Sequence, residues 1–185
     1  MPSALIPDTN KDASRLVLRT RTSGILARFA HDLEIVATEV LFRAFVDGDA
    51  WTGEVSIPVA SLRVAGVLKG GDKLDTSVLS ASDQSEIEQR IRGEVLAGGP
   101  EVKVKASGQS RDRGEAVVSM GSQSARFPLS QSIEAREGGG AKVSGRCDIS
   151  LKALGIHEVK GPLGAFKVSD TIEVVYSLSL IPGAE

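Results

Sequence analysis

The chain has 185 residues, of which 41% are hydrophobic and 25% charged, a composition typical of one globular domain that buries its own core. Its 22 basic and 24 acidic residues give a net charge of -2, which disfavours nucleic acid and anionic membrane surfaces as partners. Cys147 is the only cysteine, which excludes an intramolecular disulfide and a cysteine-based metal cluster.

Alternation of apolar and polar residues with a period of two is the dominant pattern, and it predicts β-strands. The first strand is expected over residues 15–22. Residues 1–13 lack this pattern and are expected to form a flexible N-terminal segment. The single folded domain is therefore expected to span residues 14–182.

The next strand is expected over residues 33–46, where the apolar residues change parity near 38–39. A parity change inside one strand indicates a β-bulge. The sequence Asp-Gly-Asp at 47–49 predicts a hairpin turn, because Asp-Gly tolerates positive φ. Another strand follows over residues 52–64, and Pro58 predicts an edge or an irregularity in it, because proline has no backbone donor.

Residues 64–83 show weak periodicity and are expected to form a long loop. One helix follows, with Ser82 as the expected N-cap. Its apolar residues Ile87, Ile91 and Val95 share one face, which we expect to pack on the remainder of the domain.

The second half of the chain is again rich in strands with short turns between them. The expected strands cover residues 101–109, 114–120, 124–137, 141–154 and 169–181. About eight strands joined in this way favour antiparallel meanders, which avoid exposed edges by closing into a barrel or a sandwich. An eight-stranded barrel can hold one small ligand, but side chains can also fill its interior.

Three segments resemble one known family in their order and spacing. They are "VSIPVASLRV" (55–64), "GPEVKVKASG" (99–108) and "ISLKALGIHEVKGPLGAFKVSDTIEVVYSLSL" (149–180). In these features the chain resembles the YceI family of lipocalin-like polyisoprenoid-binding proteins, over roughly residues 15–181. It departs from the family pattern at Gly99, where an aromatic residue is usual, and at Val104, where a phenylalanine is usual.

The resemblance implies an all-β fold, an extended antiparallel barrel of about eight strands with one mid-chain helix. It further implies a bacterial, non-enzymatic protein that binds or carries an isoprenoid-like lipid of the quinone or polyprenyl type in the barrel interior. No catalytic cofactor is expected besides such a bound lipid. The residues expected to contact the ligand are Leu18, Leu33, Ile35, Phe42, Val55, Ile57, Val102, Val104, Phe127, Ile149, Phe166, Val174, Tyr176 and, at the mouth, His31.

The two histidines allow a different interpretation, in which His31 and His157 form a metal or acid–base site. Metal sites need three or four ligands, and no such cluster is visible in the sequence. We therefore expect no metal and no catalytic residue. We favour the alternative in which residues 23–30 form a short helical cap at one barrel end, and His31 joins that cap to the next strand.

The sequence is compatible with two alternatives to lipid binding. One is a barrel with a filled core that acts through its loops, for example as a stress-associated interaction domain, and the other is an enzyme built around His31. No apolar run is long enough for a transmembrane helix. The N-terminus lacks a signal-peptide pattern, which predicts a cytoplasmic protein as given, or a periplasmic one if a leader was removed. Exposed strand edges would allow a homodimer.

Overall fold

The computed structural model describes residues 3–8, 10, 13–24, 30–70, 72–161 and 167–183. In this part of the chain, α1 (Ala81–Arg90) is the only α-helix, and it continues into a π-helical turn over Ile91–Val95. The strands are β1 (Ser3–Pro7), β2 (Arg15–Thr20), β3 (Thr22–Ser23), β4 (Asp32–Ala37), β5 (Leu41–Asp47), β6 (Ala50–Pro58), β7 (Leu62–Lys69), β8 (Lys73–Asp75), β9 (Glu101–Gly108), β10 (Arg113–Met120), β11 (Gln123–Ala135), β12 (Ala141–Ser150), β13 (Lys167–Val168) and β14 (Thr171–Pro182).

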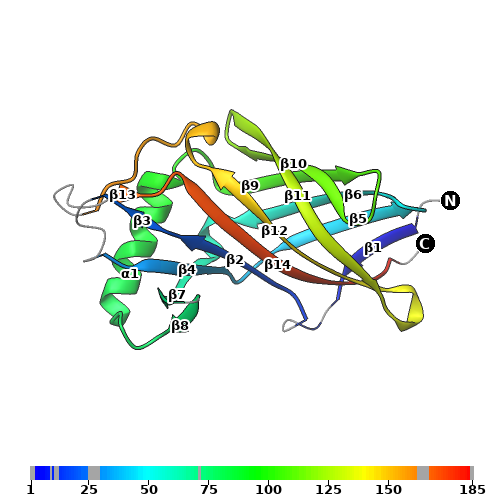
Figure 1. The fold of residues 1–185 in the computed structure, drawn as a ribbon, viewed down its shortest axis with the longest axis horizontal. Helices are drawn as coiled ribbons and strands as arrows, with labels where there is room; N and C mark the ends of the chain where they lie inside the picture. The colour runs from blue at the N-terminus through cyan, green and yellow to red at the C-terminus, as the bar shows by residue number, and fades with distance from the viewer. Residues whose placement is uncertain are drawn as a thin grey trace.

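Eight strands form a closed antiparallel barrel in the order β1-β5-β6-β9-β10-β11-β12-β14, and pairing of β1 with β14 closes the ring (Figure 1). The long strand β14 pairs with β1 through Leu5 and Pro182, and farther along with β2 through Val17 and Val175. Strands β2, β4, β7 and β8 extend the same sheet from β14 toward α1. The predicted all-β barrel of eight strands with one helix is confirmed.

The break between β4 and β5 lies where the sequence predicts a bulge. Ile35 of β4 and Phe42 of β5 both line the barrel interior, so the inward parity changes between them. The backbone N–H of Thr38 donates to the carbonyl oxygen of Ser61 over 3.0 Å, which joins this break to the matching break between β6 and β7. Strand β6 ends at Pro58, as expected for a residue without a backbone donor.

The N-terminal segment differs from its prediction. Residues 3–7, expected to be flexible, form β1 and pair with both β5 and β14. Leu5 is buried in this strand, with 6% of its surface exposed. The barrel therefore begins at residue 3, not at residue 14. Five residues ending at Pro7 are too few to display a clear alternation in the sequence.

The predicted loop over residues 64–83 is also corrected. Its first part belongs to β7, which forms a hairpin with β8. Val64, Val67 and Leu68 are all buried, so both faces of β7 are covered and the period-two pattern is lost. An extra residue in β7 opposite Glu34 and Ile35 shifts the register further.

Helix α1 packs along β7 (Figure 1). Its N-cap is Ser80 instead of the expected Ser82, and Ser80 and Asp83 form a reciprocal capping box. On the side toward β7, the Glu88 carboxylate accepts a 2.9 Å hydrogen bond from the backbone N–H of Val64. The helix thereby satisfies a backbone donor of β7.

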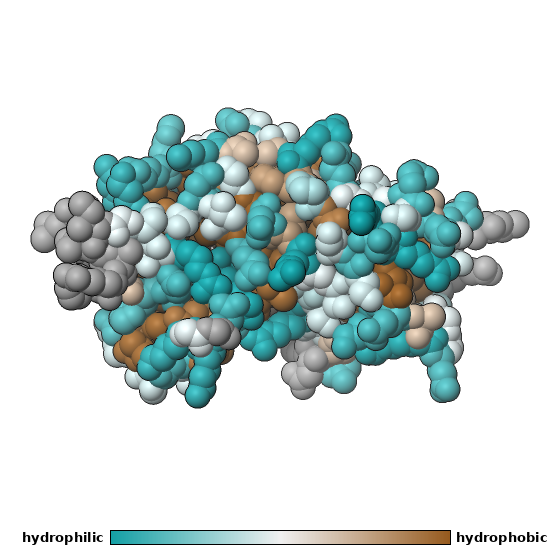
Figure 2. All heavy atoms as spheres, viewed as in Figure 1, coloured by the Kyte–Doolittle hydropathy of each residue, from teal (hydrophilic) through white to brown (hydrophobic). Residues whose placement is uncertain are grey.

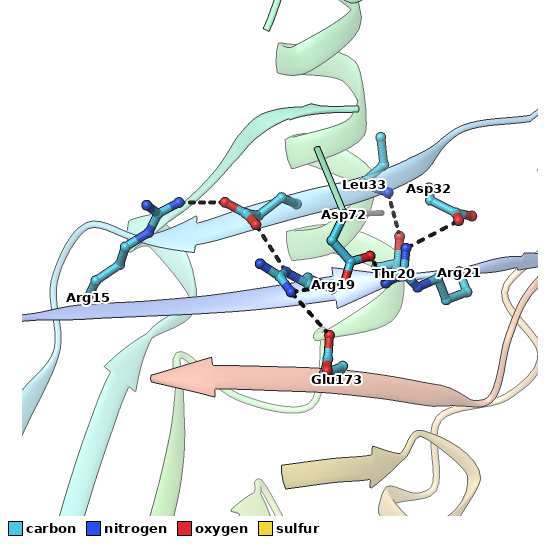
Figure 3. A network of polar contacts seen from close by, with 9 residues as sticks. Arg15, Arg19, Thr20, Arg21, Asp32, Leu33, Asp72 and Glu173 are labelled. Carbon is cyan, nitrogen blue, oxygen red and sulfur yellow. Dashed lines mark hydrogen bonds and ion pairs between the residues drawn. The ribbon is translucent and has the colours of Figure 1, made fainter. Parts of the chain in front are cut away.

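An ion network crosses the outer face of β2, β4 and β14 (Figure 3). At its centre is Glu34, whose side chain is only 3% exposed and accepts from Arg15 and, over 3.1 Å, from Arg19. Arg19 also pairs with Asp72, in the turn before β8, and with Glu173 of β14. The network therefore connects the β7–β8 hairpin to the barrel wall.

Hydrophobic residues are concentrated inside the barrel. Figure 2 shows that the face carrying β12, β14 and β2 is mainly hydrophilic, with hydrophobic residues visible between the polar ones and near β7 and β8. The buried residues form three clusters, centred on Trp51 and Val118, on Ile35 and Val174, and on Leu178. These clusters surround the interior space described next.

Candidate ligand-binding site

A cavity of about 600 Å³ lies inside the barrel. Every strand of the closed ring contributes inward-facing side chains to its wall. Helix α1 contributes further lining residues. Protein pockets of about 300–1,000 Å³ hold small organic ligands. The interior is therefore hollow enough for a small-molecule ligand.

Strand register explains why the wall is apolar. Val174 of β14 is paired with Leu18 of β2, which is paired with Ile35 of β4. On the other side of the barrel, Val55 of β6 is paired with Val104 of β9. Because side chains alternate between faces, one aliphatic parity on each strand produces continuous aliphatic rows across the barrel.

The structure brings most of the predicted contact residues together in this wall. The cavity-lining residues among them are Leu18, His31, Leu33, Ile35, Phe42, Val55, Ile57, Val102, Val104, Ile149, Val174 and Tyr176. Their location agrees with the prediction, while their role in ligand binding stays a prediction.

Two predicted contact residues do not join this set. Phe127 of β11 does not line the cavity and is packed in the cluster around Trp51 and Val118, because neighbouring side chains cover its ring. Phe166 lies outside the described residues, as does most of the helical cap expected over residues 23–30.

Helix α1 and the segment after β12 border one end of the cavity, which we call the mouth. Ile87 of α1 and Ile91 of the π-helical turn that follows it line the cavity and pack against the cluster that contains Ile35 and Val174. Arg90 donates to the carbonyl oxygen of Lys160 over 3.1 Å and thereby bridges the two borders. The charged lining residues of this end are Asp83, Glu86, Arg90, Glu94 and Lys160.

His31 is an exposed residue immediately before β4, and it lines the cavity. The neighbouring Asp32 accepts hydrogen bonds from the backbone and side chain of Thr22, which connects β3 to the start of β4. This geometry agrees with His31 as a joint at the mouth. His157 is exposed and does not line the cavity, so the cavity does not bring the two histidines together.

Tyr176 and Gln131 place polar groups in the wall away from the mouth. The hydroxyl of Tyr176 donates to Oε1 of Gln131 over 3.3 Å. Burial raises the pKa of Tyr176 above its ordinary value, with a smaller effect from Cys147, so this hydroxyl stays neutral. Arg43, a charged lining residue, is largely exposed and pairs with Glu54.

Cys147 also lines the cavity. Its Sγ donates weakly to the carbonyl oxygen of Pro128 over 3.4 Å. Burial, assisted by the negative charge of Asp148, raises the pKa of the Cys147 thiol from 9.0 to about 11. The thiol is thus protonated and chemically quiet at neutral pH.

Several lining residues are absent from the sequence-based set. Trp51 shares the parity of Val55 on β6, so alternation alone could have indicated it. Ile87 and Ile91 were expected to face the domain but not to border a cavity. Gln131 carries no such signal, because a polar residue in a strand predicts an outward side chain.

Within the described ranges, no group of three or more histidine, cysteine, aspartate or glutamate side chains is arranged to hold a metal ion. In the same part of the chain, no helix has the length and apolar character needed to cross a membrane.

Comparison with known proteins supports the fold. No family model matches the sequence. Nor does any curated protein match it. Among solved structures, the crystal structure of BcnA from Burkholderia cenocepacia is similar with a TM-score of 0.65 and 11% sequence identity, over 93% of this chain and 99% of that chain. A likeness of this length at such low identity shows a shared fold.

Proposed function

We propose that this protein binds and carries an apolar, isoprenoid-like lipid of the quinone or polyprenyl type inside its barrel. The observation that carries the proposal is the cavity of about 600 Å³, which is lined mainly by aliphatic side chains from all eight strands of the ring and from β2 and β4. Such a wall offers extensive apolar contact and few hydrogen bonds, so it favours a ligand with a long apolar part.

The energetics of burial support a lipid. Removing one methylene group from water contributes roughly 0.8 kcal/mol. About ten such groups would offset much of the estimated cost of association, which is about 4–15 kcal/mol. The apolar face of α1 adds contact area at the mouth, where the ligand would pass between α1 and the segment that contains Lys160.

The cavity disfavours the alternative of a barrel whose core is filled by side chains. The absence of an enzymatic activity, the compartment of the protein and the formation of a homodimer stay predictions. Ile6, Leu41 and Phe45 are exposed apolar residues on β1 and β5, which would be compatible with self-association.

Native mass spectrometry of the freshly purified protein tests the proposal. A carrier should retain an adduct of lipid mass, which solvent extraction releases and fragmentation identifies as an isoprenoid. A bare chain that also fails to take up added polyprenyl or quinone lipids would contradict carriage. A stoichiometric metal ion, removed by chelator together with an activity, would instead support the enzyme interpretation.

A further inference from the structure

Tyr176 is the residue at which the three hydrophobic clusters of the barrel meet. It lies near the middle of β14 and packs against all three clusters. It is nevertheless only partly buried, and it lines the cavity. The unburied part of its side chain therefore faces the ligand space in the central part of the barrel.

A glycine in the neighbouring strand determines where the Tyr176 hydroxyl lies. Gly145 of β12 is paired with Tyr176 on one side and with Gln131 of β11 on the other. A Cβ atom at position 145 would lie 2.5 Å from the Tyr176 hydroxyl, so the phenol occupies space that any other residue would fill. The tyrosine thus extends across β12 and reaches Gln131.

The contact between Tyr176 and Gln131 is loose. Its 3.3 Å separation exceeds the usual 2.7–2.8 Å of an O–H···O hydrogen bond. On its other side, the Gln131 amide nitrogen lies 3.5 Å from the carbonyl oxygen of Arg111, so Oε1 is the atom that faces the phenol. An oxygen atom that bonds both groups requires them to move apart, and the weak contacts of Gln131 on both sides make its side chain the one to rotate.

We propose that Tyr176 and Gln131 form a subsite for a hydroxyl group, and that the ligand is therefore an isoprenoid or other long-chain alcohol. This inference rests on the proposed function and specifies the ligand class. The Tyr176 hydroxyl donates to the ligand oxygen, and the ligand hydroxyl donates to Gln131 Oε1. Both protein groups then keep one hydrogen bond each, and the apolar tail contacts the aliphatic rows.

Other head groups fit this pair less well. A ketone or quinone oxygen accepts from Tyr176 but leaves Gln131 Oε1, which is partly buried, without a donor, and the loss of a hydrogen bond there weakens binding. A hydrocarbon satisfies neither group. A carboxylate brings a charge into an apolar space, where it is strongly disfavoured without a partner. The charged lining residues of α1 and Lys160 lie at the mouth, so they do not offer a carboxylate a partner beside Tyr176 and Gln131.

Three probes with the same isoprenoid tail test the subsite: farnesol, farnesyl methyl ether and farnesene. Trp51 is the only tryptophan in the chain and lines the cavity, so its emission reports binding of each probe. The variants are Tyr176→Phe, which removes only the hydroxyl, and Gln131→Leu, which removes the amide. Ser177→Ala, at the neighbouring position of β14 that does not line the cavity, is the matched control.

We expect the wild-type protein to bind farnesol in preference to the ether and the hydrocarbon. Each of the two subsite variants should lower farnesol affinity roughly threefold to tenfold relative to farnesene, while Ser177→Ala changes no ratio. The ratio of the affinities for two probes cancels any general effect of a substitution on the cavity. If one of the two variants does not fold, the other alone tests the subsite.

The two proposals fail in different ways. If the wild-type protein binds all three probes and neither variant changes their ratios, the subsite is overturned and lipid carriage stands. If the wild-type protein binds none of them, carriage itself is overturned, and the subsite with it.

Discussion

Trp51 of β6 lies across Gly108 of β9, its cross-strand partner, and its indole N–H donates a 2.8 Å hydrogen bond to the carbonyl oxygen of Ser110. A Cβ atom at position 108 would lie 2.6 Å from the indole nitrogen. Tyr176 and Gly145 form a second pair of this kind. In both pairs, a glycine leaves space for the ring of an aromatic residue that lines the cavity.

Gly108→Ala should therefore destabilise the barrel. The added methyl group overlaps the indole and neighbouring backbone, and such overpacking typically costs about 1–3 kcal/mol. Denaturant unfolding followed by Trp51 emission measures this loss. Gly70→Ala is the control, because a Cβ atom there meets nothing within 4 Å. Equal stability of both variants would show that the packing of the Trp51 indole does not require a glycine at position 108.

The tether between Glu88 and Val64 gives a second prediction. Glu88→Ala removes the acceptor of the Val64 N–H and should cost about 1–3 kcal/mol, the usual penalty for an unsatisfied buried group. Glu88→Gln keeps an acceptor oxygen and should lose less. Amide hydrogen exchange at Val64 should accelerate in the alanine variant alone. Gln89→Ala, at an exposed position of α1 that does not line the cavity, should leave both measurements near wild type.

The ion network around Glu34 gives a third prediction. Because Glu34 is the buried member and the arginines are more exposed, loss of the arginines should cost more than loss of the glutamate charge. We expect Arg19→Met to lose up to about 3 kcal/mol and the double variant with Arg15→Met about 3–5 kcal/mol. Glu34→Gln should lose less than either. Chemical denaturation ranks the three, and the reverse order would contradict this account of the network.

Much of the barrel could be predicted from alternation, because each strand exposes one face to the interior and one to solvent. Leu18, Ile35, Val55 and Val174 all follow this rule. The rule fails for a strand whose two faces are both buried. Strand β7 is covered on both faces by its surroundings, so Val64, Val67 and Leu68 show no alternation.

The site was harder to predict than the fold. Whether the interior is hollow depends on the distance between opposite walls of the barrel. The pattern of residues along the sequence does not specify that distance. Phe127 has the parity of lining residues such as Leu129 but is covered by its neighbours. Gln131 is a polar residue on the inward parity of β11, between Leu129 and Ile133, and there the Tyr176 hydroxyl reaches it across Gly145.

The buried thiol gives a fourth prediction. Folding raises the pKa of Cys147 from 9.0 to about 11, so the folded protein holds this proton more tightly than the unfolded chain. At pH 8, Cys147 should react with a disulfide reagent roughly a hundredfold more slowly than in the unfolded chain, because the thiolate is the nucleophile. A rate equal to that of the unfolded chain would contradict its burial.

The raised pKa of Cys147 also makes the stability of the folded protein depend on pH. The stabilisation from this proton is present below pH 9 and is lost as the pH rises toward 11. Cys147→Ala should therefore lose less stability than the wild-type protein over this range. Thermal melting of both proteins across the range measures the difference, and parallel curves would contradict it.

Two phenylalanine substitutions on β6 test whether a ligand occupies the barrel interior. Val55 lines the cavity, whereas Thr52 faces outward on the same strand. A phenylalanine at position 55 should occupy ligand space, and the loss of about two methylene contacts corresponds to roughly tenfold weaker binding. The same residue at position 52 adds equal bulk outside the barrel.

The most direct measurement is a titration of the wild-type protein, Val55→Phe and Thr52→Phe with farnesol, followed by Trp51 emission. Our account predicts saturable binding by the wild-type protein, equal affinity for Thr52→Phe, and roughly tenfold weaker binding for Val55→Phe at near-native melting temperature. No saturable response from the wild-type protein, or equal affinity of both variants, would contradict a ligand inside the barrel.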